Sequence, residues 1–273
     1  MLLRKLLIDY KLSNVSHLII DEVHERDIST DFLLIIIKIL LQTRPDLKIV
    51  LMSATINSSL FLDYFQDENC GFLNIPGRNY SVTHYMLEDC IEQTGFRIDK
   101  NSSKVAFKPP RSFTEDLRVK RSRRSKALQK LQSNYSDHTI RTLDIIDEEI
   151  LNTELIKLLV IRIIHGADMK NDAILIFVSG FEAIKEVITS LENCNQLGRD
   201  TIILPLHSSL SSTEQAKVFE IYPDKVKIVV ATNIAETSIT IEDCVYVIDT
   251  CKIKENRYDA QIKMSVLGNV SIR

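Results

Sequence analysis

The chain alternates short apolar runs with longer amphipathic stretches, and this alternation limits the folds open to it. Short apolar runs fit buried strands, and stretches with an apolar residue every three or four positions fit helices that cover them. The order predicts an α/β fold, with helices on both faces of a parallel sheet. We expect strands at residues 17–20, 48–52, 173–178, 201–204, 226–230 and 244–248. We expect helices at residues 32–41, 154–164, 182–191 and 213–219.

A basic segment of different character separates the first two strands from the last four. Pro76 and Gly77 mark a turn where one domain ends. From Glu88 to about Ser136 the periodicity fades, so we expect an insertion that is partly disordered. The expected organisation is a first lobe at residues 1–78, the start of a second lobe with the insertion at 79–137, and the rest of that lobe at 138–273.

Composition excludes several classes of protein. With 45% hydrophobic and 26% charged residues, the chain is an ordinary globular protein rather than a disordered one. Its net charge of -3 gives no global basic field. No apolar run approaches the ~20 residues that a membrane span needs. The five cysteines form no CxxC pair, which fits a reducing compartment, so we expect the cytoplasm, the nucleus or both.

Two adjacent carboxylates, Asp21 and Glu22, directly follow the first strand, with Val23 and His24 next. Ligands bind at the carboxyl edge of open parallel sheets, and this pair lies at that edge. One carboxylate can hold a hydrated Mg2+ beside a nucleotide, while the other accepts a proton from an attacking water. The alternative is a solvated acidic turn, which is common on protein surfaces.

Five motifs together resemble the DEAH-box branch of superfamily 2 helicases. Their order and spacing match that family across nearly the whole chain, apart from the basic insertion. They are VSHLIIDEVHERD (15–27), LMSAT (51–55), IPGR (75–78), LPLHSSL (204–210) and ATNIAETSITIEDCVYVID (231–249). The resemblance implies two RecA-like lobes, the first truncated at its N-terminus and the second at its C-terminus.

The resemblance also implies roles for the first-lobe residues. Asp21 is the carboxylate that contacts Mg2+ through a water molecule, and Glu22 is the general base for the attacking water. His24 links the nucleotide site to the opposite lobe. Ser53 and Thr55 resemble the motif that couples hydrolysis to the nucleic-acid face; the alternative for them is a plain turn at a strand end.

In the second lobe, Thr232 and Asn233 resemble contacts to nucleic-acid phosphates, which carry no sequence information. Glu236, Thr237 and Ser238 lie where the family communicates with the nucleotide. The alternative is an exposed polar loop that caps a helix. His207 stays outside the expected catalytic set because a histidine packed in the core fits it better. Residues 252–267 correspond to the family's strand-separating β-hairpin, although Thr250 and Cys251 stand where the family often has small or glycine residues.

Closer likeness points to the helicases that bind AU-rich elements and unwind G-quadruplexes. It rests on MLEDCIE, NYSDHTIRTLDIIDEE and VYVIDTCKIKENRYDAQ. The expected partner is single-stranded or structured RNA, or DNA, bound by a monomer. The basic insertion allows three interpretations: a phosphate-tracking surface, a nuclear-import patch or a solvated charged helix. Its basic residues are Arg118, Lys120, Arg121, Arg123, Arg124, Lys126 and Lys130.

The chain lacks two motifs that ATP turnover by such a helicase needs. A phosphate-binding loop reads GxxxxGK[ST], and none of the seven glycines is followed by lysine. The family's QRxGRxGR arginine motif is also missing. We therefore expect that the chain is part of an ATP- and Mg2+-dependent RNA helicase, and that these 273 residues alone do not hydrolyse ATP. The alternative is a catalytically dead RNA-binding or scaffold relative.

Overall fold

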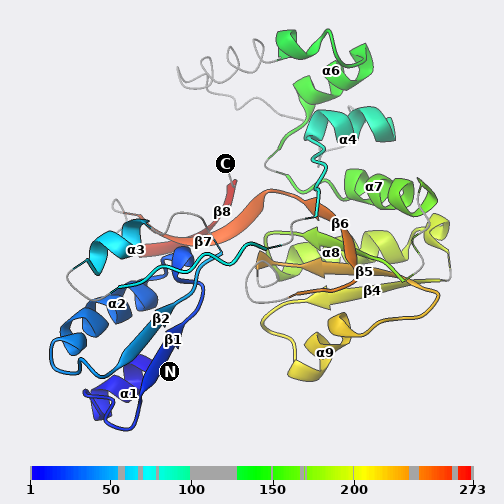
Figure 1. Ribbon diagram of the computed structural model, residues 1–273. Coiled ribbons are helices and arrows are strands. Elements are labelled where there is room, and N and C mark those ends of the chain that lie inside the picture. Colours follow the sequence, from blue (N-terminus) through cyan, green and yellow to red (C-terminus); the bar gives the residue numbers. More distant parts are fainter. Residues whose placement is uncertain are drawn as a thin grey trace. The chain divides into compact units, whose positions relative to one another are not determined.

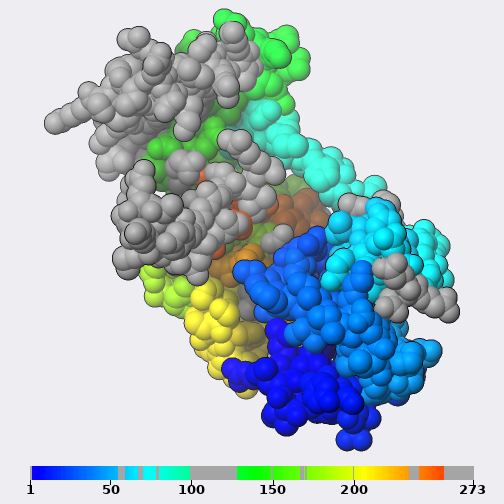
Figure 2. Space-filling model, turned by 90° about the vertical axis from the view of Figure 1, so that its left-hand side faces the viewer, coloured from blue at the N-terminus to red at the C-terminus, as the bar shows by residue number. Residues whose placement is uncertain are grey.

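The computed structural model describes residues 2–54, 59–66, 70–77, 80–98, 128–148, 150–166, 169, 171–198, 200–233, 240–259 and 264–271. The chain divides into two compact units, Met1–Ser81 (unit 1) and Val82–Arg273 (unit 2). In Figure 2, the blue and cyan residues of unit 1 form one continuous body.

Unit 1 is built around two parallel strands. Its elements are α1 (Leu2–Ile8), β1 (His17–Ile20), η1 (Val23–Glu25), α2 (Ile28–Leu41), β2 (Lys48–Leu51) and α3 (Ser59–Tyr64). The register of β1 and β2 runs from His17 opposite Lys48 to Ile20 opposite Leu51. Alternate strand residues Leu18 and Ile20 are buried against α2 and α1. The two strands therefore end side by side, at the same edge.

Helix α2 begins four residues before the expected start, because Asp27 caps it. The Asp27 carboxylate accepts hydrogen bonds from the amides of Ser29 and Thr30, at 2.8 and 3.1 Å. Those amides have no partner within the helix, so a side-chain acceptor at this position stabilises the first turn. The cap fixes where the turn after β1 must end.

Unit 2 contains a four-stranded parallel sheet in the order β4-β5-β3-β6 (Figure 1). The strands are β3 (Ala173–Phe177), β4 (Thr201–Leu206), β5 (Val226–Ala231) and β6 (Cys244–Asp249). The helices beside them are α7 (Thr153–Gly166), α8 (Phe181–Glu192), α9 (Ser212–Ala216), η2 (Asn195–Leu197) and η3 (Lys217–Phe219). This parallel α/β architecture confirms the expected fold class.

Both faces of this sheet are covered, in agreement with the nearly continuous burial of β3 and β5. Ile174 and Ile176 of β3 pack with residues of α7 and α8. Leu175, on the opposite face, packs with Val218 of η3. Pro205 lies in β4, which extends two residues beyond the expected strand; β4 is an edge strand, where proline is tolerated.

A buried lysine at the start of β5 joins several segments at the amino edge of the sheet. Lys227 is 2% exposed, and its ammonium lies 2.8 Å from the Asp243 carboxylate. It also donates to the carbonyl oxygens of Val218 and Glu220, at 2.7 and 3.1 Å. Each of these contacts compensates part of the cost of burying the charge.

A small helical cluster precedes the sheet, built from α4 (Leu87–Thr94), α6 (Asp137–Ile145) and the start of α7. The expectation that regular structure fades from Glu88 is wrong for α4. Asp89 accepts the Met86 amide at 2.8 Å and closes the first turn, while the side chain of Ile91 is fully buried. Ile98 and Leu128 both pack against this cluster, although residues 99–127 separate them in the sequence. Most of the expected basic insertion lies outside the described residues.

The last two strands form an antiparallel hairpin. β7 (Lys252–Asp259) pairs with β8 (Met264–Ser271), from Lys252 opposite Ser271 to Asp259 opposite Met264. Figure 1 shows β6 leading directly into β7. Within the described part of the chain, no helix combines the length and the apolar character that a bilayer crossing demands.

Candidate functional site

The turn after β1 is joined to the end of β2 by the backbone. The Met52 amide donates to the Ile20 carbonyl oxygen at 2.8 Å, and the Val23 amide donates to the Met52 carbonyl oxygen at 3.1 Å. The parallel ladder thus continues past both strands. It brings Asp21 and Glu22 to the same edge as Ser53, which directly follows Met52.

The two carboxylates differ in backbone and exposure. The Glu22 amide donates to Asp21 Oδ1 at 2.8 Å, which fixes one oxygen of an exposed carboxylate. Glu22 itself has φ 54° and ψ 36°, in the left-handed region that residues with a Cβ rarely adopt. The adjacent Val23 side chain is 1% exposed and anchors the turn in the core of unit 1. The turn therefore holds Glu22 in a backbone conformation that costs free energy.

His24 lies beside Glu22. Its Nδ1 is 3.4 Å from Glu22 Oε2, a distance that makes an ion pair when the imidazole is protonated. That nitrogen is shielded from solvent and makes no hydrogen bond to the residues that the structure describes. Of the expected first-lobe residues, the structure thus brings Asp21, Glu22 and His24 together in one turn.

The turn ends in a fixed ion pair. Arg26 donates two hydrogen bonds to the Asp31 carboxylate, at 2.8 and 2.9 Å, and these hydrogen bonds lower the pKa of Asp31. The pKa of Asp27 is lowered chiefly by the hydrogen bond from the Thr30 hydroxyl. We did not expect these roles from the sequence, although an Asp three positions before a Thr, ahead of an apolar run, is a recognisable helix start.

In unit 2, polar residues directly follow β4, β5 and β6 at the carboxyl edge of the sheet, whereas buried Val178 follows β3. Thr232 comes after β5 and is buried; its amide donates to the Leu206 carbonyl oxygen at 3.4 Å. Asn233, next along the chain, is exposed. The arrangement leaves an amide side chain open to a ligand at this edge. The expected site residues Thr55, Glu236, Thr237 and Ser238 lie outside the described residues.

His207 follows β4 and is half-buried at this edge rather than packed inside the core. Its Nδ1 accepts the Ser209 amide at 3.1 Å and lies 2.8 Å from the Ser209 hydroxyl oxygen. The imidazole packs against Phe181, with ring centroids 5.2 Å apart. The expectation of a core histidine is therefore wrong, because the strand ends one residue before it.

The donor set around Asp21 suits a magnesium ion that keeps most of its waters. Mg2+ is usually bound in proteins through one or two carboxylates together with substrate phosphates. Asp21 supplies one exposed carboxylate. The described residues contain no group of three or more His, Cys, Asp or Glu side chains that would hold a metal ion without a substrate.

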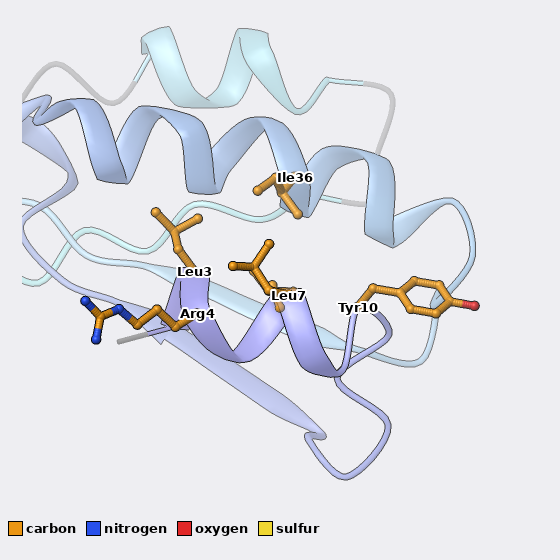
Figure 3. Close-up of a pocket in the computed structure, with 6 residues that line it drawn as sticks. Leu3, Arg4, Leu7, Tyr10 and Ile36 are labelled. Atoms are coloured by element: carbon orange, nitrogen blue, oxygen red, sulfur yellow. The ribbon is translucent and has the colours of Figure 1, made fainter.

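A pocket of about 270 Å³ lies between α1 and α2, away from the expected site residues. Figure 3 shows Leu3, Leu7, Tyr10 and Ile36 around it. Its lining is mostly apolar, and Arg4 is the one charged residue among the six that line it.

Comparison with known proteins gives a consistent result. Residues 151–263 match the helicase conserved C-terminal domain. The chain is 41% identical to the human putative ATP-dependent RNA helicase DHX57, over 99% of this chain and 22% of that protein. It is 38% identical to the rat ATP-dependent DNA/RNA helicase DHX36 (95% and 27%) and 40% identical to the human ATP-dependent RNA helicase DHX29 (97% and 21%). The chain thus spans about a quarter of the length of these relatives.

The fold has a solved counterpart. The E. coli DExH-box NTPase HrpB superposes with a TM-score of 0.61 at 22% identity, over 98% of this chain and 26% of the other. At this identity the comparison establishes the architecture alone.

Proposed function

Because this chain belongs to the DEAH/DExH-box helicases, to which it is homologous along 95–99% of its length, we propose that the whole protein is an ATP-dependent RNA helicase. The observation that carries the proposal is the acidic turn after β1, held against the end of β2 by the bond between Val23 and Met52. ATP with Mg2+ is the proposed cofactor.

Each residue of the turn has a distinct task in this proposal. When bound, Mg2+ neutralises charge on the transferring phosphate. Asp21 would hold it through water, and the Glu22 amide orients one oxygen of the Asp21 carboxylate. Glu22 takes the proton of the attacking water, a role that typically contributes about 10²- to 10⁴-fold in rate. His24, whose Nδ1 lies 3.4 Å from Glu22 Oε2, would orient that carboxylate. Its link to the opposite lobe is the role that the family resemblance implies.

Ser53 and Thr55 would connect this turn to the nucleic-acid face. Thr232 and Asn233 would bind phosphates of the strand, and Glu236, Thr237 and Ser238 would sense the nucleotide. Phosphate contacts carry no base information, so the proposed substrate is RNA recognised by backbone and shape. G-quadruplexes and DNA belong to the same proposal, supported by the sequence likeness described above.

The whole protein would act as a monomer in the cytoplasm or nucleus; its five cysteines form no CxxC pair, which fits a reducing compartment. We further propose that the 273 printed residues hydrolyse no ATP alone, since they contain no GxxxxGK[ST] loop.

The experiment is a comparison of RNA-stimulated ATP hydrolysis in the whole protein and in two variants. Glu22→Gln should reduce the rate at least 100-fold and leave RNA affinity within about twofold. Glu25→Gln, in the same turn but exposed, is the matched control and should retain activity. A Glu22→Gln variant as active as the parent would refute the proposal. RNA binding by a parent that hydrolyses no ATP would support the scaffold alternative instead.

A further inference from the structure

Only Thr250 and Cys251 separate β6 from β7, so these two residues set the direction in which the hairpin leaves the sheet. We call residues 249–254 the hairpin root. Cys251 has φ 54°, in the left-handed region, and its amide donates to Asp249 Oδ1 at 2.7 Å. The root is therefore a sharp, hydrogen-bonded turn in an unfavourable backbone conformation rather than a continuous strand.

Thr250 ties this root to the central strand of the sheet. Its amide and its hydroxyl both donate to the carbonyl oxygen of Phe177, at 3.2 and 2.8 Å. The amide bond continues the ladder between β3 and β6. The hydroxyl bond is additional, and it depends on a side chain that glycine or proline does not have.

Lys254 makes a second contact with the same corner. Gly180 precedes α8, and a methyl group added there would lie 3.0–3.2 Å from Nζ, Cε and Cδ of Lys254. The lysine stem therefore lies directly over the glycine, in space that a larger residue would occupy. Both contacts reach the turn between β3 and α8, one at Phe177 and the other at Gly180.

We propose that Thr250 and Lys254 are positioning residues that lock the β7–β8 hairpin to the turn between β3 and α8. Thr250 restrains the root by its hydroxyl, and Lys254 restrains the first residues of β7 by packing on Gly180. The hairpin then moves as one body with the sheet of unit 2. The functional part of this proposal rests on the proposed function: a rigid connection transmits motion of the second lobe to the hairpin, and the hairpin transmits it to the duplex that it separates.

The lock can be measured in the 273-residue chain, without any ligand, by 15N relaxation of the hairpin amides. In the parent, β7 and β8 should show order parameters near the ~0.85 of rigid backbone. Thr250→Val removes the hydroxyl at nearly constant volume and should lower them toward ~0.6. Thr250→Ser keeps the hydroxyl and should preserve the parental values. Amides of β3 and β5 should not change, which shows that the sheet remains folded.

Lys254→Ala provides an independent variant, because it removes the second contact and leaves the Thr250 bonds in place. It should give an intermediate loss of order. Parental order parameters in both Thr250→Val and Lys254→Ala would overturn the lock, as would equal loss in Thr250→Val and Thr250→Ser.

The functional consequence is tested in the whole protein. Thr250→Val should lower duplex unwinding at least fivefold and leave RNA-stimulated ATP hydrolysis within about twofold, with unwinding restored in Thr250→Ser. Equal loss of both activities, or unchanged unwinding, would contradict the positioning role. A parent that neither hydrolyses ATP nor unwinds would refute the proposed function, and the relaxation measurement would still decide the lock.

Discussion

The Val23 amide donates a 3.1 Å hydrogen bond to the carbonyl oxygen of Met52, so the acidic turn and the residue before Ser53 share one backbone contact. A shift of Ser53 therefore moves the peptide that carries Glu22. This geometry supports the proposal that a movement of the carboxylates is transmitted to the end of β2.

Ser53→Ala in the whole protein should weaken duplex unwinding at least fivefold, with ATP hydrolysis reduced less than twofold. The Val23–Met52 bond survives the change, so the carboxylates stay in place while the side chain proposed for coupling is lost. Parallel unwinding and ATPase assays measure the split. Ser29→Ala, on exposed helix surface, is the control; an ATPase loss as large as the unwinding loss would contradict the coupling role.

Asp27→Ala should destabilise unit 1 by about 0.5–2 kcal/mol, because it removes the N-cap of α2. Asp27→Asn keeps an oxygen acceptor and should remain close to the parent. Urea unfolding followed by circular dichroism compares the three proteins. Equal stability of the alanine and asparagine variants would show that the cap contributes nothing.

Lys227→Met should destabilise unit 2 by about 3–5 kcal/mol, because it leaves the mostly buried Asp243 carboxylate without its cation. The control is Lys185→Met, which removes an exposed pair with Glu182 and a cation–π contact with Phe181 and should cost at most about 1 kcal/mol. Thermal unfolding by circular dichroism measures both. Similar midpoints of thermal unfolding for the two variants would contradict the conclusion that the buried ion pair matters more than the exposed one.

Tyr135 should ionise at a higher pH than an ordinary tyrosine. Its hydroxyl donates to Asp89 at 2.8 Å, and this bond, with smaller contributions from desolvation and nearby carboxylates, raises its pKa to about 12. The pKa is raised on folding, so the bond stabilises the folded state below pH ~10, the ordinary tyrosine value, and that contribution is lost as pH rises toward about 12.

Ultraviolet titration checks this, since the sequence has no tryptophan to obscure tyrosinate absorption. Tyr135→Phe should remove one transition from the most alkaline part of the curve and reduce the loss of stability above pH ~10. Removal of a transition near pH ~10 instead would show that Asp89 does not hold the phenol.

The sequence predicted most elements of the sheets because its buried strands are nearly pure apolar runs bounded by polar residues. The strand at 17–20 has the expected bounds, and β3 ends one residue earlier than expected. Helix α4 escaped prediction because its single fully buried residue, Ile91, gives almost no periodic signal. Its stability depends on contacts with α6 and α7, which lie far along the chain.

The site was predictable in part. Asp21 and Glu22 are adjacent in sequence, so any fold that ends a strand before them keeps them together. The left-handed backbone of Glu22 and the hydrogen bond from Thr250 to Phe177 depend on the conformations of the turns in the folded chain, and no residue pattern predicts them. A lone lysine within an apolar strand, Lys227, indicates that a buried cation needs a partner. The sequence does not indicate that this partner is Asp243.

Ile98 and Leu128 pack against the same apolar cluster of unit 2, so both ends of the stretch between them are anchored to that cluster. The entropic cost of closing such an excursion grows only slowly with its length. A change in the length of that stretch should therefore cost the folded state little. The stretch between residues 98 and 128 is therefore a suitable place to insert a fluorescent protein or an affinity tag.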